Sequence, residues 1–173
     1  FKSNIENFFN LKKKIPKTII STYHSKNKIP QKVYDNIKIF SIGYKHLVFD
    51  DSEIKSFLKK NYSINILDTF NSLKGAHKAD LFRYCYLYIN GGVYIDLDIL
   101  PKKPLNQLLV KDTDFISALE NRPGRHINGI YQGFIACKKG INFLKTAIET
   151  IVYYTQINYY PSNEESDIWI NIL

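Results

Sequence analysis

The chain has 173 residues, of which 45% are hydrophobic and 23% charged, so it can bury one sizeable core and has a globular and not a disordered composition. No apolar run approaches the roughly 18 to 20 residues that span a bilayer, and Cys85 and Cys137 are too few for a disulfide scaffold or a thiolate metal site. The formal net charge of +8 comes from scattered lysines, which favours a solvated surface over attraction of an anionic substrate or membrane, and favours nucleic acid least.

The sequence carries no marks of an internal domain boundary. Repeats and low-complexity blocks are absent, and the Pro and Gly residues are spread along the chain, so we expect residues 1–173 to form a single domain. Because the sequence contains no Met, we expect that it begins after the natural start or was cut from a longer chain. This expectation allows membrane association through segments outside the sequence.

Strand and helix patterns alternate in the first half of the chain. Residues 15–23 are rich in β-branched residues and predict a buried strand, and residues 45–49 predict a second one. The polar residues 50–52 then offer an N-cap to a helix over 53–60.

The second half continues the alternation. Apolar residues recur at helical spacing over 72–90, and the glycines at 91 and 92 end that helix, because Gly tolerates the left-handed conformation of a C-cap. A strand is predicted over 93–100, where Pro101 and Pro104 stop the ladder, and further elements are predicted as strands at 115–119 and 131–137 and a helix at 141–156. This order predicts an α/β layer structure, in which ligands gather at the carboxyl ends of the strands.

Two carboxylates stand at the end of the predicted 93–100 strand. Side chains alternate along a strand, so Tyr94, Asp96 and Asp98 share one face while the apolar residues face the core. Unpaired carboxylates are costly in such a setting, and a hard divalent cation, Mg²⁺ or Mn²⁺, is one good solution because it takes oxygen ligands and substrate phosphates. The alternative is that Asp96 and Asp98 only end the strand and cap the next turn.

Asp80 and Arg83 stand three residues apart on the preceding helix and therefore lie on one face. An ordinary surface ion pair is the alternative to a functional pair. His77 lies on the same helical face, where it would border a site built from Asp80.

The residues Ala79-Asp80-Leu81-Phe82-Arg83-Tyr84, followed by Leu87 and by residues 91–98 with the sequence GGVYIDLD, resemble a known signature. They are similar to the DxD-containing sugar-binding region of GT-A glycosyltransferases in family 32, the fungal Golgi mannosyltransferase type, which is similar to the catalytic domains of clostridial glucosylating toxins. The resemblance extends more weakly to residues 15–17 and 131–140. It implies a Rossmann-like GT-A fold, with a mixed, mostly parallel sheet flanked by helices, and one catalytic domain over 1–173. Because later elements of the family are missing, we expect either that this domain is truncated at its C-terminus or that this branch of the family is minimal.

The resemblance also implies roles for the motif residues. Asp80 and Arg83 would hydrogen-bond the donor sugar hydroxyls and help to hold the phosphates, and Tyr94 would lie against the donor. Asp96 would contact the ribose and the sugar, and Asp98 would ligate the metal with Asp96 beside it.

Three further positions follow from the resemblance. Tyr23 stands where the family commonly has a Trp that meets the nucleobase, Ala76 would line the pocket wall, and Gln132 stands where the family carries a polar residue near the reaction centre.

A metal-dependent glycosyltransferase is therefore the predicted function. It would use Mn²⁺ or Mg²⁺ to move a sugar from a UDP- or GDP-sugar to a glycan, protein or lipid acceptor, and the resemblance implies retention of anomeric configuration. The alternative is a non-catalytic module that binds a sugar nucleotide or glycan. A glycoside hydrolase is disfavoured, because its two carboxylates flank the scissile bond whereas Asp96 and Asp98 are expected to point the same way.

Overall fold

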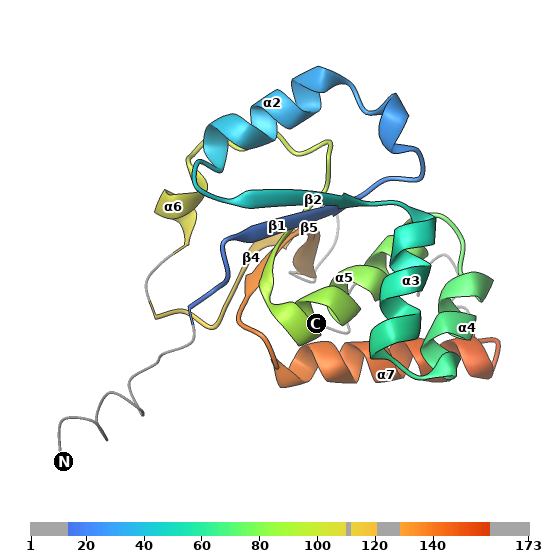
Figure 1. Cartoon of the computed structure of the whole chain (residues 1–173). Helices are drawn as coiled ribbons and strands as arrows, with labels where there is room; N and C mark the ends of the chain where they lie inside the picture. Colours follow the sequence, from blue (N-terminus) through green and yellow to red (C-terminus); the bar gives the residue numbers. More distant parts are fainter. Residues whose placement is uncertain (1–13, 110–111, 121–128, 160–173) are drawn as a thin grey trace, which may run out of the picture.

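Five strands form one mixed sheet in the order β2-β1-β3-β5-β4 (Figure 1). In the computed structural model, residues 14–109, 112–120 and 129–159 are described, and the strands are β1 (Thr18–Thr22), β2 (Lys45–Phe49), β3 (Gly92–Ile95), β4 (Phe115–Glu120) and β5 (Gly129–Cys137). β1 pairs in parallel with β2 and β3, whereas β5 is antiparallel to both β3 and β4, so β5 runs against the other four. The carboxyl ends of β1, β2 and β3 therefore share one edge with the start of β5.

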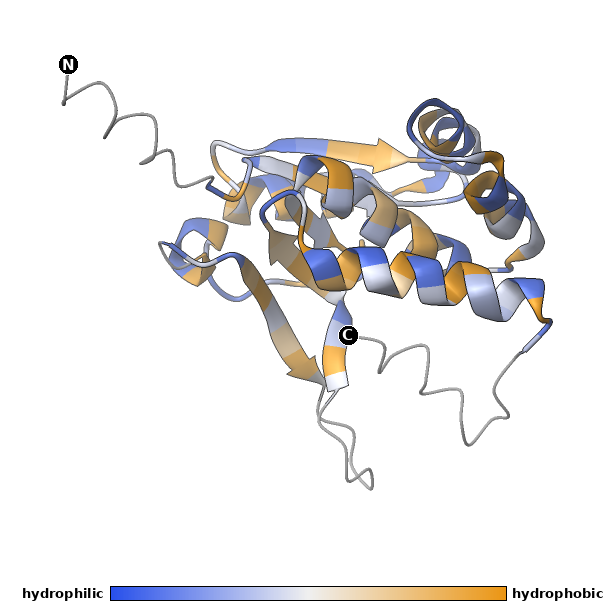
Figure 2. Cartoon of the chain, turned by 90° about the horizontal axis from the view of Figure 1, so that it is seen from below, coloured by the Kyte–Doolittle hydropathy of each residue, from blue (hydrophilic) through white to orange (hydrophobic). Residues whose placement is uncertain are grey.

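Helices cover both faces of the sheet and enclose two apolar clusters. They are the short 3-10 helix η1 (Lys26–Lys28), α2 (Gln31–Phe40), α3 (Asp51–Asn61), α4 (Ile64–Ser72), α5 (Ala76–Asn90), α6 (Leu105–Leu108) and α7 (Asn142–Gln156). Core residues of α2 and α6 cluster on one face, and those of α3, α4, α5 and α7 on the other (Figure 1). In Figure 2, α7 alternates between orange and blue, as expected of a helix that buries one apolar stripe. The α/β fold class predicted from the sequence is confirmed.

Two glycines form the connection from α5 to β3 and set how closely these two elements pack. Gly91 and Gly92 have φ of +67° and +112°, and an added Cβ would come within 2.7 Å of the Lys139 amide nitrogen or the Thr18 carbonyl oxygen, respectively. Only glycine fits both the conformation and the space, so α5 turns directly into a strand that lies against β1. Every residue of α5 from Leu81 to Leu87 is buried, so about two turns of this helix are enclosed on all sides.

Most of the predicted elements are confirmed. The N-cap expected within residues 50–52 forms at Asp50, whose side chain accepts hydrogen bonds from the amides of Ser52 and Glu53 in a capping box that begins α3. The predicted strands at 45–49, 115–119 and 131–137 and the helix at 141–156 all form, with ends shifted by two residues at most, whereas β1 is shorter than the predicted 15–23 strand.

Two predicted elements were wrong in extent. The helix over 72–90 forms as α5 but begins at Ala76 and not at Ser72, because α4 ends at Ser72 and Gly75, with φ of +51°, stands between the two helices. The strand over 93–100 stops at Ile95: the Asp96 amide makes a last bond to the Gly133 carbonyl, and the Ile99 amide then turns back to the Asp96 carbonyl. Asp98 therefore lies in a turn, and not on a strand face with Asp96.

Three α-helices were not predicted. α2, α4 and α6 are absent from the expected elements, although Val33, Ile37 and Phe40 in α2 have helical spacing and pack in the core cluster with Ile19 and Val93. The four-residue α6 buries only Leu105 and is too short for a periodic signal.

The two cysteines are buried and free, and burial raises the pKa of Cys137 to about 12. Within the described residues, we find no helix with the length and apolar character that crossing a membrane requires.

Candidate functional site

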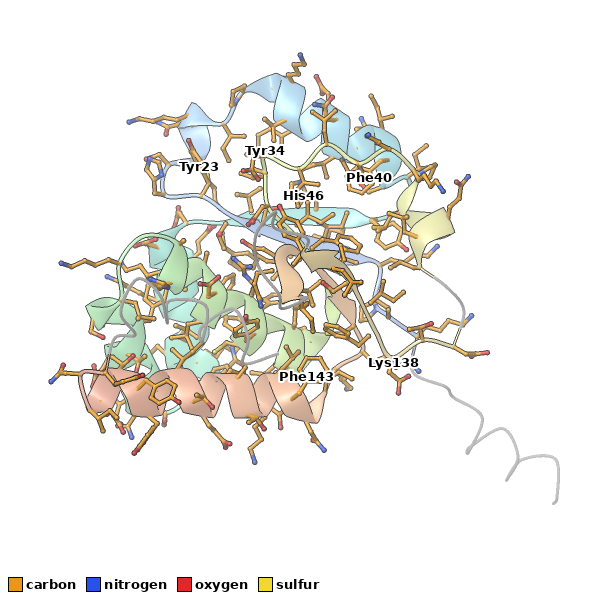
Figure 3. All side chains as sticks on the ribbon, turned by 180° about the vertical axis from the view of Figure 1, so that it is seen from behind. Tyr23, Tyr34, Phe40, His46, Lys138 and Phe143 are labelled. Carbon is orange, nitrogen blue, oxygen red and sulfur yellow. The ribbon has the colours of Figure 1, made fainter. Side chains whose placement is uncertain are left out.

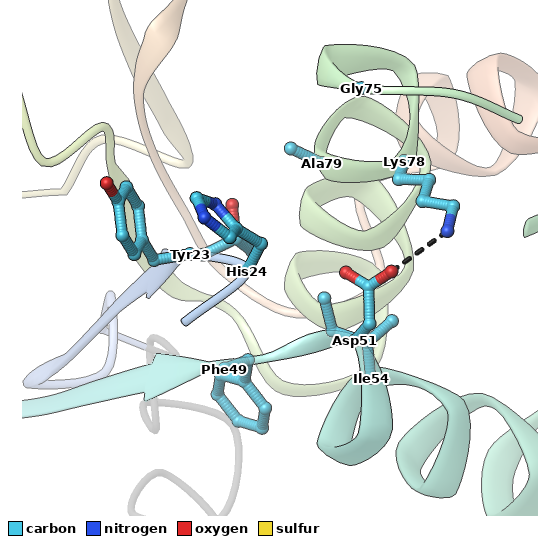
Figure 4. A pocket seen from close by; sticks show the side chains of 9 residues that line it. Tyr23, His24, Phe49, Asp51, Ile54, Gly75, Lys78 and Ala79 are labelled. Atoms are coloured by element: carbon cyan, nitrogen blue, oxygen red, sulfur yellow. Dashed lines mark hydrogen bonds and ion pairs between the residues drawn. The ribbon is translucent and has the colours of Figure 1, made fainter. Parts of the chain in front are cut away.

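A cavity of about 340 Å³ opens where β1 and β2 end, against the first turn of α5 (Figure 4). Tyr23 and His24 follow β1, and their ring centroids lie 4.6 Å apart. The Lys78 ammonium donates to the Asp51 carboxylate at 2.9 Å across the other side of the cavity. The full lining is Thr22, Tyr23, His24, Phe49, Asp51, Ile54, Gly75, Lys78 and Ala79. Aromatic rings beside fixed charges suit a planar, polar group.

Asp96 lies at the same edge of the sheet and is joined to the cavity by two hydroxyl groups. Its Oδ1 accepts a hydrogen bond from the Tyr94 hydroxyl at 2.6 Å, and that hydroxyl lies 3.3 Å from Thr22 Oγ1. Burial raises the pKa of Tyr94, so its hydroxyl stays protonated and can donate. Because Thr22 also lines the cavity, the carboxylate and the cavity share a wall.

Asp98 is exposed in the turn after β3. Its carboxylate makes no hydrogen bond or ion pair with any residue in the part of the chain that the structure describes. An exposed carboxylate two residues after Asp96 in the chain is a suitable ligand for Mg²⁺ or Mn²⁺, which commonly bind one or two carboxylates and otherwise keep waters or substrate phosphates. Across residues 14–109, 112–120 and 129–159, no group of three or more His, Cys, Asp and Glu that could hold a metal lies together.

Arg83 is a buried cation at the centre of this edge. Its side chain is 4% exposed, which contradicts the alternative of an ordinary surface ion pair with Asp80. The Nη2 atom lies 2.9 Å from Asp80 Oδ1 and 3.9 Å from Asp96 Oδ1. The guanidinium carbon lies 4.2 Å from the centroid of the Tyr94 ring, a cation–π contact. The Arg83 guanidinium therefore forms ion pairs with both Asp80 and Asp96.

The rest of the guanidinium ties α5 to β5. Nη1 donates to the Gln132 carbonyl oxygen at 2.5 Å, and Nε donates to the Ala79 carbonyl oxygen at 3.4 Å. The Tyr84 hydroxyl donates to the Gln132 side-chain carbonyl oxygen. Gln132, predicted near the reaction centre, is thus fixed by both its backbone and its side chain, and burial raises the pKa of Tyr84 so that its hydroxyl remains a donor.

The other predicted site residues differ in their access to the cavity. Tyr23 is 36% exposed and lines it, and its contact with a nucleobase stays a prediction. Tyr94 is 1% exposed and packs against Arg83, so it supports the Arg83 side chain from the protein interior. Ala76 begins α5 next to Gly75 but is not a lining residue of this cavity, so its role stays a prediction.

His77 borders Asp80, as its helical position suggested. Its Nδ1 lies 3.6 Å from Asp80 Oδ2, and a hydrogen bond with that carboxylate raises the pKa of His77. We call Asp80, Asp96 and Asp98, which lie near the carboxyl end of β3, the acidic edge. The exposed His77 side chain therefore adds a titratable charge next to this acidic edge.

Gly133 leaves room for the Asp96 carboxylate. A Cβ at this buried position would lie 2.8 Å from Asp96 Oδ2 and 2.8 Å from the Tyr131 hydroxyl and its ring carbon. Both neighbours are the far ends of side chains, so the glycine keeps a small volume free between Asp96 and Tyr131.

Several contributors were not predicted from the sequence. Tyr84 and Gly133 carried a usable signal, since Tyr84 follows Arg83 in the motif and a glycine inside a strand often marks the close approach of another group. The Asp51–Lys78 pair and the Thr22–Tyr94 contact carried no such signal, because the two residues of each pair are 27 and 72 positions apart in the chain, respectively.

Residues 30–115 match the family described as "Glycosyltransferase sugar-binding region containing DXD motif". The match includes Arg83, Asp96, Asp98 and the cavity-lining residues from Phe49 onward, but not the lining residues Thr22, Tyr23 and His24.

Curated relatives include glycosyltransferases of a virus and of fungi. An uncharacterised glycosyltransferase of Acanthamoeba polyphaga mimivirus is 32% identical over 102 residues, which is 58% of this chain and 41% of the relative. Inositol phosphoceramide mannosyltransferase 1 of Schizosaccharomyces pombe is 40% identical over 79 residues, which is 45% of this chain and 24% of the relative. The chain thus spans less than half the length of either relative.

Among solved structures, the PaToxG glycosyltransferase superimposes with a TM-score of 0.64 and covers 99% of this chain and 76% of its own. At 16% sequence identity, this likeness shows the shared fold.

Proposed function

We propose that this protein, whose residues 30–115 belong to the glycosyltransferase sugar-binding regions containing a DXD motif, transfers a sugar from a nucleoside diphosphate donor to an acceptor. The acceptor is a glycan, protein or lipid, the donor is a UDP- or GDP-sugar, and the anomeric configuration is retained. The observation that carries the proposal is the contact chain from the cavity through Thr22 and Tyr94 to Asp96, because it joins a nucleoside-sized space to an acidic edge.

The donor would lie along this edge with its nucleoside in the cavity. The Tyr23 ring supplies a face on which a base can stack. The pyrophosphate would then point toward Asp96 and Asp98, and the sugar toward Asp80 and Arg83.

The protein groups around the sugar are fixed before the donor arrives. Arg83 holds Asp80 and the Gln132 backbone, so the donor meets groups whose rotamers are already set by burial and hydrogen bonds. Such preorganisation lowers the cost of orienting the anomeric carbon for attack. Asp80, whose side chain is 26% exposed, supplies the carboxylate of this group that would accept hydrogen bonds from sugar hydroxyls.

Asp98, with Asp96 beside it, would hold Mn²⁺ or Mg²⁺ against the pyrophosphate. A bound divalent cation supplies neutralisation of the negative charge that develops on the departing nucleoside diphosphate.

Donor binding should therefore require a divalent cation, because the Asp96 and Asp98 carboxylates would otherwise repel the pyrophosphate. We expect titration calorimetry with UDP or GDP to show binding with Mn²⁺ and a loss of at least about tenfold in affinity with EDTA, or about 1.4 kcal/mol. Equal affinity in both conditions would remove the metal from the proposal.

Gly133→Ala should impair turnover with little effect on folding. The new Cβ displaces the Asp96 carboxylate and the Tyr131 ring end, and a shift of about 1 Å at a reacting centre costs on the order of a hundredfold in kcat/KM. Kinetics and thermal melts of Gly133→Ala and Gly133→Val would check this. Loss that grows with side-chain volume at a nearly constant Tm is expected, whereas wild-type kinetics in both variants would show that the space is not needed.

A panel of UDP- and GDP-sugars with Mn²⁺, scored for both binding and donor hydrolysis, tests the activity itself. Turnover of one donor class supports a transferase, and NMR of the anomeric proton of the product would establish its configuration. Tight, metal-dependent binding with no turnover of any donor or acceptor would favour a non-catalytic sugar-nucleotide module instead.

A further inference from the structure

The surface at the end of α2 combines exposed isoleucines with lysines. Ile39 is 71% exposed and Ile42 is 75% exposed, and Lys38 beside them is also exposed. Residues 38–46 contain two lysines and no acidic residue. We call Lys17, Lys38, Ile39, Ile42 and Tyr44 the α2 patch.

A second cavity, of about 440 Å³, opens beneath this patch. Its walls include two aromatic residues, and the rings of Tyr34 and His46 lie 6.1 Å apart between α2 and the sheet (Figure 3). The full lining is Tyr34, Lys38, Ser41, Ile42, Gly43, Tyr44 and His46.

Lysines supply the positive charge around this cavity. Lys38 lines it, and Lys17 Nζ lies 5.9 Å from the centroid of the Tyr44 ring, which is also part of the wall. His46 adds no charge near neutral pH, because burial lowers its pKa to about 4. The nearby carboxylate on α2 is Asp35, which accepts a hydrogen bond from Gln31 at 3.0 Å.

We propose that the α2 patch docks on a lipid surface that contains anionic phospholipids. Ile39 and Ile42 enter the boundary of the acyl chains, while Lys17 and Lys38 meet headgroup phosphates at the cavity mouth. Apolar anchors next to basic side chains are the two signals that together hold a peripheral protein on an anionic bilayer. The formal net charge of +8 adds long-range attraction to the same surface.

Docking through this patch leaves the donor cavity open to solvent. The patch lies at the start of β2 and the donor cavity at its end, and a strand of five residues spans roughly 15 Å. The acidic edge would thus stand about that far from the headgroups, which leaves its donor accessible from the aqueous phase.

Flotation of the whole chain with lipid vesicles tests the proposal. We expect at least about tenfold more binding to phosphatidylcholine vesicles containing about 30% phosphatidylserine than to pure phosphatidylcholine, and a loss of binding when NaCl rises from about 0.1 M to about 0.5 M. Ile39→Ser with Ile42→Ser, and separately Lys17→Glu with Lys38→Glu, should each weaken binding at least about tenfold.

Matched variants at other sites distinguish binding through the α2 patch from effects of net charge and of exposed apolar side chains in general. Lys59→Glu with Lys60→Glu on α3 makes the same change in net charge, and Ile64→Ser with Ile157→Ser removes two other exposed isoleucines. Both should keep most of the vesicle binding. Thermal melts of all four variants confirm that they fold, and Mn²⁺-dependent nucleotide binding in solution should be unchanged in each.

Three results would overturn the proposal. These are no binding to anionic vesicles, equal binding to neutral ones, or equal losses in the patch and control variants. Light scattering adds a fourth: a dimer that dissociates in Ile39→Ser with Ile42→Ser would show that the patch meets a second copy of the chain.

Discussion

Asp98→Asn is expected to reduce turnover by about a thousandfold or more while the fold stays intact, a loss of roughly 4 kcal/mol of transition-state stabilisation. The amide keeps the shape of the side chain but removes the negative charge that a divalent cation needs. Because Asp98 is exposed and has no partner among the described residues, its free energy of unfolding should change by no more than about 0.5 kcal/mol.

Steady-state kinetics with the donor, together with urea unfolding, would check both halves of this expectation. Asp35→Asn is the matched control, since it removes an exposed carboxylate from α2, far along the chain from the acidic edge. Unchanged turnover in Asp98→Asn would return Asp98 to a turn-capping role. A large loss of stability would show that the carboxylate serves the fold.

Arg83→Lys is expected to reduce both stability and catalytic efficiency. Lysine keeps the positive charge, but one ammonium group cannot reach Asp80, the Gln132 carbonyl and the Ala79 carbonyl together as the planar guanidinium does. Loss of one charge-assisted hydrogen bond at this buried position should cost about 1.5–3 kcal/mol of unfolding free energy. The same loosening of Asp80 and Gln132 should lower kcat/KM by about two orders of magnitude, or roughly 2.7 kcal/mol.

The control for this variant is an exposed ion pair. Lys145→Ala removes the partner of Glu149 on α7, where both side chains are more than half exposed, and should cost less than about 1 kcal/mol with no kinetic change. Kinetics are compared below the Tm of Arg83→Lys, so that both variants are folded. Wild-type kinetics in Arg83→Lys would remove its proposed role, whatever happens to stability.

The sequence alone was enough to predict the segment that carries the motif, which consists of a helix, two glycines and a strand with an acidic end. The helix pattern, the paired glycines and the acidic strand end all lie within about twenty residues, and each acts through local chemistry: apolar spacing, the left-handed freedom of Gly91, and the hard-cation preference of carboxylates. That is why the fold class and the family resemblance could be inferred without coordinates, and why an N-cap within residues 50–52 could be expected.

The depth of burial was decided only by the tertiary structure. From spacing alone, Arg83 and Asp80 could equally have been a surface ion pair, because a helical period does not say what covers the helix. Packing of β3 and β5 over α5 leaves Arg83 4% exposed and brings its Nη1 to a carbonyl that lies 49 residues away in the chain. Contacts between such distant residues depend on sheet order, which no local pattern encodes.

The same reason explains the errors in the site. The strand pattern suggested that Asp98 shares a face with Asp96, but the ladder ends where Asp96 bonds Gly133 of β5, so a neighbouring strand decides where the turn begins. The cavity likewise exists only because β1 and β2 end where α5 begins, which sets Asp51 against Lys78 and Thr22 against Tyr94. Local chemistry thus determined which residues could bind a cation and a sugar, and the sheet determined which of them face the cavity, because solvent exclusion and register are properties of the assembled chain.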